Sequence, residues 1–213
     1  MKAQADMDAR RYRQAEDQFT FIIFNFPGSR QASDAQYFLA ETYLRSKDYV
    51  QASSEFDFYL KSFPNGRFQE EATYKLALSY LRSAPGRVRD QARALKAREV
   101  IDGFIEAYPE SQFRPDAEKL RGEIGERLAL REFDAARLYY ASGEYKSALV
   151  YYTYVNDSYP TARWPDIESY RYAVSLLEAG DTAKARAVLS ELVTGEHEPK
   201  VKDLARAALG RTH

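Results

Sequence analysis

Arginine and aromatic side chains are the residue types in this sequence that could do chemistry, and the chemistry they suit is peptide recognition. Five arginines stand close together in residues 82–98, namely Arg82, Arg87, Arg89, Arg93 and Arg98. An arginine holds a carboxylate through charge-assisted hydrogen bonds, so this basic patch predicts contact with an acidic partner or with a peptide carboxylate. A solvated loop of ordinary charge is the alternative interpretation.

Catalytic chemistry finds little support in the sequence. The chain has no cysteine, which excludes disulfides, thiolate metal sites and a cysteine nucleophile. Its two histidines, His197 and His213, fall in an expected loop and at the terminus, and we interpret both as solvated residues without partners. Glycine-rich phosphate motifs and the GxSxG motif of hydrolases are absent. We therefore expect a protein that is not an enzyme and that binds no cofactor or metal.

A helical repeat has to position the aromatic side chains. Four aromatic–proline pairs end on Pro27, Pro64, Pro109 and Pro160. Counting back from each pair gives residues spaced alternately three and four apart, which is one face of an α-helix. In chain order these sets are Tyr12, Ala15, Phe19, Ile22 and Phe26; Tyr49, Ala52, Phe56, Tyr59 and Phe63; Ala94, Ala97, Ile101, Phe104 and Tyr108; Tyr145, Ala148, Tyr152, Val155 and Tyr159; and a degenerate fifth set of Thr182, Ala185, Leu189 and Leu192.

A first helix precedes each of these second helices. It is marked by a small alanine and a large residue three positions later, in the pairs Ala40 and Tyr43, Ala77 and Tyr80, Ala136 and Tyr139, and Ala173 and Leu176. The small residue lets two helices approach and the large one fills the gap between repeats. With the turn at Gly143 and the terminal prolines, the pattern resembles the tetratricopeptide repeat. It predicts an all-α superhelix of about five helical hairpins, each burying its face against its neighbours.

The repeats are unevenly spaced, which indicates two insertions. One falls around residues 83–90, and the other lengthens a first helix that we expect to run over residues 115–142, roughly 40 Å at 1.5 Å per residue. Ser33 or Asp34, Asp48 and Asp181 are expected N-caps, and residues 199–209 are expected to form a last, capping helix. We divide the chain into residues 1–112, a peptide-binding half, and residues 113–213, a docking half.

Composition sets limits on the class of protein. The 213 residues carry a formal net charge of −1, so no basic excess points to nucleic acid. No apolar run approaches the roughly 18 residues that predict a membrane-spanning helix. By register, the first helix of repeat one would begin before Met1, and we expect that upstream sequence, including any export signal, is missing here.

The order of the features is more informative than any single repeat. It is carried by Ser83 with the insert, Asp90 and Gln91, Tyr108-Pro109-x-Ser111, Asp116 and Ala117, Leu128-Ala129-x-x-Glu132, and the long helix into repeat four. Over roughly residues 10–195 this resembles the BamD family of outer-membrane protein assembly lipoproteins. The resemblance implies a scaffold of the β-barrel assembly machinery at the periplasmic face of the outer membrane. It implies N-terminal repeats that recognise the aromatic C-terminal signal of unfolded barrel proteins, and C-terminal repeats that dock the periplasmic domains of a BamA-like barrel subunit. The lipid-bearing cysteine of that family is not in this sequence, so membrane contact is expected only through an anchor absent from this chain.

Two sets of side chains are candidates for these contacts. We expect a peptide ending in an aromatic residue to lie along the first helices of repeats one to three, against Phe38, Tyr43, Tyr74, Tyr80, Arg82 and Arg87. The docking candidates are Tyr140, Tyr151, Tyr154, Trp164 and Arg171. Tyr140, Tyr151 and Tyr154 fall outside the core register, and tyrosine is favoured at protein interfaces, although packing between repeats explains most tyrosines equally well.

Other classes of protein share parts of this pattern. A periplasmic cell-envelope coordinator of the YbgF/CpoB type has the same repeats, and an upstream coiled coil favours it over a scaffold with an upstream lipid-bearing cysteine. A generic protein-interaction module or a cytosolic regulatory domain is a further alternative, favoured by an upstream sequence without a signal. An enzyme is disfavoured by the absence of clustered titratable residues.

Overall fold

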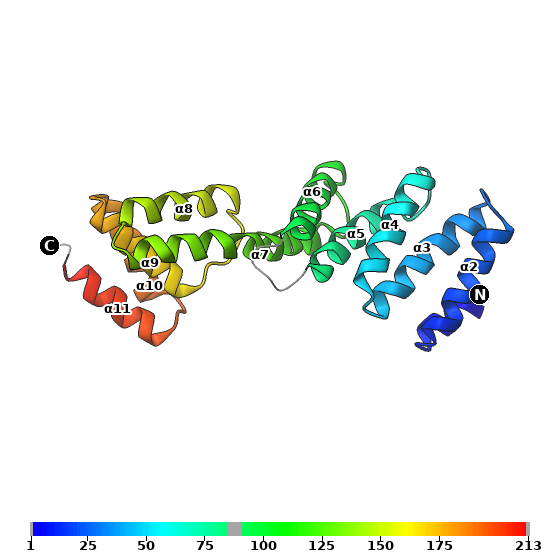
Figure 1. The fold of residues 1–213 in the computed structure, drawn as a ribbon, viewed down its shortest axis with the longest axis horizontal. Helices are drawn as coiled ribbons and strands as arrows, with labels where there is room; N and C mark the ends of the chain where they lie inside the picture. The colour runs from blue at the N-terminus through cyan, green and yellow to red at the C-terminus, as the bar shows by residue number, and fades with distance from the viewer. Residues whose placement is uncertain (1, 85–90, 212–213) are drawn as a thin grey trace. The chain divides into compact units, whose positions relative to one another are not determined.

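The chain folds into helices joined by short connections (Figure 1). The computed structural model describes residues 2–84 and 91–211. Over those residues the fold is all-α and tetratricopeptide-like, as the repeat pattern predicts. In chain order the helices are α1 Lys2–Asp8, α2 Tyr12–Asn25, α3 Arg30–Arg45, α4 Tyr49–Ser62, α5 Gln69–Ser83, α6 Ala92–Ala107, α7 Arg114–Ala141, α8 Tyr145–Ser158, α9 Asp166–Glu178, α10 Thr182–Thr194 and α11 Pro199–Leu209.

The chain separates into two compact units, Met1–Ile124 and Gly125–His213, called unit 1 and unit 2 below. Within unit 1 each helix from α1 to α6 packs on the next, and within unit 2 α8 packs on α9, α9 on α10, and α11 on both α9 and α10. The boundary falls inside α7, which is continuous over 28 residues and confirms the long helix expected from the sequence.

The core follows the predicted register most closely at the middle of each second helix. Phe19, Phe56 and Tyr152 are completely buried there, as are the alanines that precede them. The ends of the register are less uniform, because the terminal aromatic Phe26 is 54 % exposed whereas Tyr159 is 7 % exposed. The central small–large alternation therefore forms the core, and the terminal aromatics pack to different extents.

Helix termini agree with the sequence at most positions. The Asp48 and Asp181 side chains accept hydrogen bonds from the backbone N–H groups of Gln51 and Lys184, as predicted for N-caps. The prediction of Ser33 or Asp34 as the cap of α3 is wrong. That helix begins one turn earlier, and the Ser29 hydroxyl caps it by accepting from the Ala32 N–H at 3.0 Å.

Candidate protein-binding surfaces

The aromatic residues predicted to bind a peptide lie on the first helices of unit 1 and also pack on their own neighbours. On α3, the Phe38 ring stacks on Phe19 with centroids 5.8 Å apart and meets Phe68 edge-on at 5.4 Å. The Tyr43 hydroxyl donates to Glu16 Oε1 at 2.6 Å, and burial and this carboxylate raise the pKa of Tyr43. Both rings are half-buried, so each keeps an accessible edge while joining two repeats.

Tyr74 and Tyr80, both on α5, lie in different surroundings. The Tyr74 ring is stacked on Phe113 with centroids 5.8 Å apart, at the start of α7. The Tyr80 ring lies beside Lys96 of α6, whose Nζ is 5.8 Å from the ring centroid. The structure therefore groups Phe38 with Tyr43 and sets Tyr74 and Tyr80 on separate neighbours.

The basic residues predicted for the peptide carboxylate differ in their availability. The Arg82 guanidinium is exposed and forms an ion pair with Glu123 at 2.9 Å. Arg98 is paired with Asp102 at 3.4 Å. Arg87 and Arg89 lie outside the described residues. A carboxylate ligand at Arg82 has to compete with Glu123, although the exposed pair contributes little to stability and can be exchanged.

A buried charge cluster joins the first helices α3 and α5. The Lys75 ammonium donates to Glu41 Oε2 at 2.6 Å and to the Tyr37 hydroxyl at 2.8 Å, and it pairs with Glu71 at 2.9 Å. Burial, followed by the charge of Glu41, raises the pKa of Tyr37. Arg45 holds the other oxygen of Glu41 at 2.8 Å. The cluster fixes the spacing of the two helices on which the predicted peptide-binding aromatics stand.

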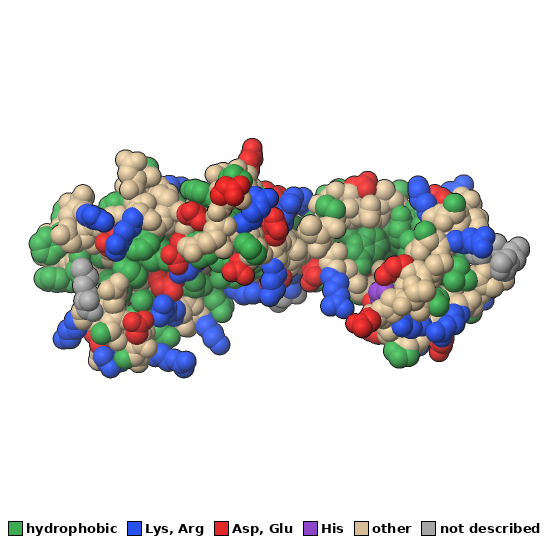
Figure 2. Space-filling view, turned by 180° about the vertical axis from the view of Figure 1, so that it is seen from behind, with side chains coloured by type: hydrophobic (Ala, Val, Ile, Leu, Met, Phe, Trp, Pro, Cys, Tyr) green, Lys and Arg blue, Asp and Glu red, His purple; other side chains and the backbone are tan. Residues whose placement is uncertain are grey.

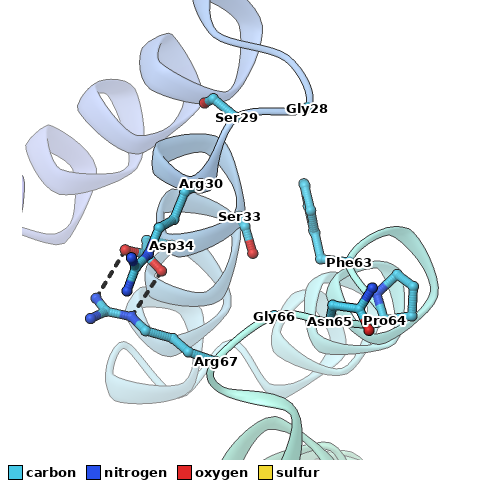
Figure 3. Close-up of a pocket in the computed structure, with 10 residues that line it drawn as sticks. All are labelled: Gly28, Ser29, Arg30, Ser33, Asp34, Phe63, Pro64, Asn65, Gly66 and Arg67. Atoms are coloured by element: carbon cyan, nitrogen blue, oxygen red, sulfur yellow. Dashed lines mark hydrogen bonds and ion pairs between the residues drawn. The ribbon is translucent and has the colours of Figure 1, made fainter.

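A hollow of about 390 Å³ lies between the start of α3 and the loop before α5 (Figure 3). On its wall Arg67 makes two contacts with Asp34, from Nε at 3.0 Å and from a terminal nitrogen at 2.9 Å. Gly66 passes so close to the Tyr59 hydroxyl that an added Cβ would collide with it. That hydroxyl in turn accepts from the Phe68 N–H at 3.0 Å. The Phe-Pro-x-x-Arg loop is thus locked by contacts within the chain.

The docking candidates of unit 2 are divided between the core and the surface. Trp164 lies among Phe133, Tyr152 and Tyr172, with ring centroids 5.0–5.8 Å away. Arg171 donates to Glu168 at 2.6 Å. Both candidates therefore have structural partners within unit 2.

Tyr140 and Tyr151 are half-buried, with Tyr140 edge-on to Tyr145 and Tyr151 stacked on Tyr139 at 5.5 Å. Tyr154 is the most accessible of the predicted docking tyrosines, at 50 % exposed. Burial raises the pKa of Tyr140, whereas the hydrogen bond to Tyr139 raises that of Tyr151.

Glu168 is the most buried carboxylate of unit 2, at 1 % exposed. It accepts from Arg137 Nε of α7 at 2.8 Å, from Arg171 at 2.6 Å, and from the Tyr152 hydroxyl of α8 at 3.0 Å. Three helices therefore meet on one side chain. Burial, followed by the charge of Glu168, raises the pKa of Tyr152.

The prediction that His197 is solvated and without partners is wrong. Its ring lies between two carboxylates, with Nδ1 2.9 Å from Asp166 and Nε2 2.9 Å from Glu191. These hydrogen bonds raise the pKa of His197. The contact with Asp166 could not be predicted from local spacing, because Asp166 is 31 residues away in the sequence, at the start of α9. His213 lies outside the described residues.

Comparison with known protein families assigns most of the chain. The family model described as YfiO, outer membrane lipoprotein, matches residues 1–166, and a tetratricopeptide-repeat model matches residues 169–194. The chain belongs to the YfiO (BamD) outer membrane lipoprotein family. A comparison with curated protein sequences gives no match.

Membership of the YfiO family identifies the protein as an outer-membrane assembly-type scaffold with periplasmic outer-membrane association. The family is built on tetratricopeptide repeats and is generally non-enzymatic. In the part of the chain that the structure describes, no helix is long and apolar enough to cross a membrane. Within the same residues, no group of three or more acidic or histidine side chains is arranged to hold a metal ion.

Two accessible residues of this family member were missed by sequence reasoning. Leu138, on α7, is 67 % exposed and Val150, on α8, is 66 % exposed. Val150 and Tyr154 are four residues apart on α8 and so share one exposed face of that helix. In Figure 2, hydrophobic side chains of unit 2 are visible in a recessed area and in scattered groups among polar and charged side chains. Their position outside the core register was a usable signal, because an apolar residue off the buried face is expected to be exposed.

Proposed function

We propose that this protein is a non-catalytic scaffold of the β-barrel assembly machinery, with one half that binds clients and one that docks a partner. Residues 1–112 would bind segments of unfolded outer-membrane proteins. Residues 113–213 would dock the periplasmic domains of a BamA-like barrel subunit. The family match over residues 1–166 carries this proposal.

The accessibility of the first-helix aromatics supports a peptide site in the N-terminal half. Phe38, Tyr43 and Tyr74 are half-buried, whereas the core aromatics Phe56 and Tyr59 of the second helix α4 have no exposed surface. A half-buried ring held on a rigid helix offers contact area at a low entropic cost. An extended peptide with an aromatic end could pack along these rings and place its carboxylate at Arg82.

Fluorescence anisotropy with a labelled peptide from the C-terminus of an outer-membrane barrel protein tests the client half. Tyr74→Leu and Arg82→Ala should each weaken binding about tenfold, since a contact worth roughly 1.4 kcal/mol changes affinity tenfold. Arg186→Ala is the matched control, because Arg186 is an exposed arginine of α10 in unit 2. Unchanged affinity in both unit 1 variants contradicts the proposed site.

The exposed face of α8 that carries Val150 and Tyr154 supports a docking site in the C-terminal half. Exposed apolar side chains that lie together commonly mark protein-interaction sites. Co-purification with the periplasmic domains of a BamA-like protein tests this half. Val150→Asp should abolish co-purification, while Val50→Asp, a matched exposed valine on α4, should leave it intact. Retention of the partner by Val150→Asp contradicts docking through this surface.

A further inference from the structure

A second hollow in unit 1, of about 470 Å³, lies between the second helices α4 and α6. Asp57, Phe58 and Lys61 line it from α4, Arg93 and Lys96 line it from α6, and Tyr80 of α5 lies between them. Its volume is within the range of about 300–1,000 Å³ typical of ligand pockets. We call it the basic hollow.

The charges around the basic hollow are unbalanced. Three cations line it against one carboxylate, and that carboxylate, Asp57, is paired with Lys61 at 2.6 Å. Arg93 donates to the Ser83 hydroxyl at 3.1 Å, and Lys96 lies over the face of Tyr80. Within residues 2–84 and 91–211, neither Arg93 nor Lys96 forms an ion pair. Two positive charges are therefore available to a ligand.

Aromatic surface accompanies these cations. Phe58 is 52 % exposed on α4, and Tyr80 is half-buried. No hydrogen bond is found for the Tyr80 hydroxyl among the described side chains, although Tyr43, the equivalent residue of the preceding repeat, donates to Glu16. A ligand with carboxylates and an apolar side chain can satisfy the cations, the hydroxyl and the rings together.

The preceding repeat shows that repeat packing does not require this basic charge. Lys96 and Gln51 both stand twelve residues before the aromatic that ends their helix, Tyr108 (108 − 96 = 12) and Phe63 (63 − 51 = 12). In the same register Arg93 corresponds to Asp48 (108 − 93 = 15 and 63 − 48 = 15). One repeat earlier, the register positions of Arg93 and Lys96 are therefore held by an acidic and a neutral residue, Asp48 and Gln51. The basic charge is a local property of the α4–α6 hollow.

We propose that the basic hollow binds an acidic, aromatic-containing segment of a partner protein. Charge complementarity selects an anionic occupant, and the recessed position of Tyr80 between two helices favours a chain segment over a flat lipid surface. The site stands on the second helices and shares only Tyr80 with the proposed client site. It therefore gives the scaffold a second contact surface, which overlaps the client site only at Tyr80.

Anisotropy of the full chain with a short labelled peptide of Asp, Glu and Phe tests the proposal. Lys96→Glu and Arg93→Glu should each weaken binding at least tenfold, and binding should fall as salt rises from about 50 to about 300 mM. A peptide with Asn and Gln in place of Asp and Glu should not bind. Arg13→Glu is the matched control, because Arg13 is an exposed arginine of α2 in the same unit.

Hydrogen exchange with the acidic peptide bound should show protection in α4 and α6. Affinity for the barrel C-terminal peptide should not change in Arg93→Glu, because Arg93 donates to Ser83 whereas Lys96 lies over Tyr80, and this result separates the proposal from the client site. Unchanged affinity for the acidic peptide in both charge-reversal variants overturns the proposal. Equal loss in Arg13→Glu also overturns it, as does binding of anionic phosphatidylglycerol vesicles in preference to the peptide. Circular dichroism of each variant, with Lys96→Gln as a milder change, excludes loss of the fold as the cause.

Discussion

In each unit of the scaffold a buried glutamate ties helices together, Glu41 in unit 1 and Glu168 in unit 2, and the two differ in the side chains that hold them. In unit 2, Glu168 is 1 % exposed and is held by two arginines and a tyrosine from three helices. In unit 1, Glu41 is 7 % exposed and is held by Lys75 and Arg45, each of which also pairs with a second carboxylate, Glu71 or Asp8. A planar guanidinium keeps its geometry in a fixed fork, whereas a lysine ammonium is a flexible point charge. Unit 2 therefore depends more heavily on its buried carboxylate than unit 1 does.

Replacing the better buried glutamate should have the largest effect. Glu168→Leu leaves the Tyr152 hydroxyl without its acceptor and Arg137 and Arg171 without their shared carboxylate. Breaking a buried ion pair costs about 3–5 kcal/mol. We expect the free energy of unfolding to fall by about 3 kcal/mol, the lower end of this range, because both arginines can turn toward solvent. Urea unfolding gives the magnitude, and hydrogen exchange should place the loss in α8 and α9. A loss below about 1 kcal/mol contradicts the dependence of unit 2 on Glu168.

The matched change in unit 1 should be smaller. Glu41→Leu removes one carboxylate from Lys75 and Arg45, but Lys75 keeps Glu71 and Arg45 keeps Asp8. We expect the free energy of unfolding to fall by about 1–2 kcal/mol. Hydrogen exchange should become faster in α3 and α5 and stay unchanged in α9. A loss equal to that of Glu168→Leu would show that both clusters are equivalent.

Removing a single hydroxyl sharpens the comparison further. Tyr152→Phe deletes the donor to Glu168, and Tyr37→Phe deletes an acceptor of Lys75, which keeps two carboxylates. A hydrogen bond to a charged group contributes about 1.5–3 kcal/mol, so Tyr152→Phe should cost about 1.5 kcal/mol and Tyr37→Phe less. Thermal unfolding of the two variants side by side measures the difference. The reverse order contradicts our ranking.

The smallest change in stability should come from a change of pH, and it should be confined to unit 2. The two carboxylates beside His197 raise its pKa, so the protonated ring stabilises the fold fully below the unfolded pKa, near 6.5. That stability is lost as pH rises through the raised folded pKa. Asp166, whose pKa is lowered by the Glu198 N–H and by His197, stays charged throughout this range.

The measurement is the opening free energy at α9–α11, from hydrogen exchange corrected for the intrinsic pH dependence of amide exchange, between mildly acidic and mildly alkaline pH. His197→Gln should remove the pH dependence there, and α3–α5 should show none in either protein. A pH response that survives in His197→Gln contradicts the assignment to this histidine.

Much of the fold could be predicted because the repeat register states which residues are buried. The alternation of alanines with large residues located the helix pairs, and Asp48 and Asp181 predicted where α4 and α10 begin. The cap of α3 was missed because Ser29 and Ser33 are both plausible caps one turn apart, and local spacing does not decide between them. The Glu168 cluster and the His197 contacts were missed for a different reason. Arg137, Tyr152 and Asp166 make these contacts from other helices, 16 to 31 residues away, and no periodicity links such distant residues.

The candidate site was predictable in residue type and less so in arrangement. The sequence grouped Tyr80 with Arg82, whereas the structure sets Tyr80 beside Lys96 and pairs Arg82 with Glu123. Residues two apart on a helix point in different directions, and the faces of the neighbouring helices then decide which charges each one meets. Only the placement of α6 against α4 revealed the basic hollow.

The continuity of α7 has a consequence for the order in which the protein acquires structure. The first part of this helix supplies buried Ala117, Leu120 and Ile124, and its later part supplies buried Leu128 and Phe133. A chain that emerges N-terminus first cannot close unit 1 until the middle of α7 has appeared. Once that half is helical, the costly nucleation step is complete, and the rest of α7 needs only elongation. Folding of unit 1 thus nucleates the helix that continues into unit 2, so unit 1 should fold before unit 2.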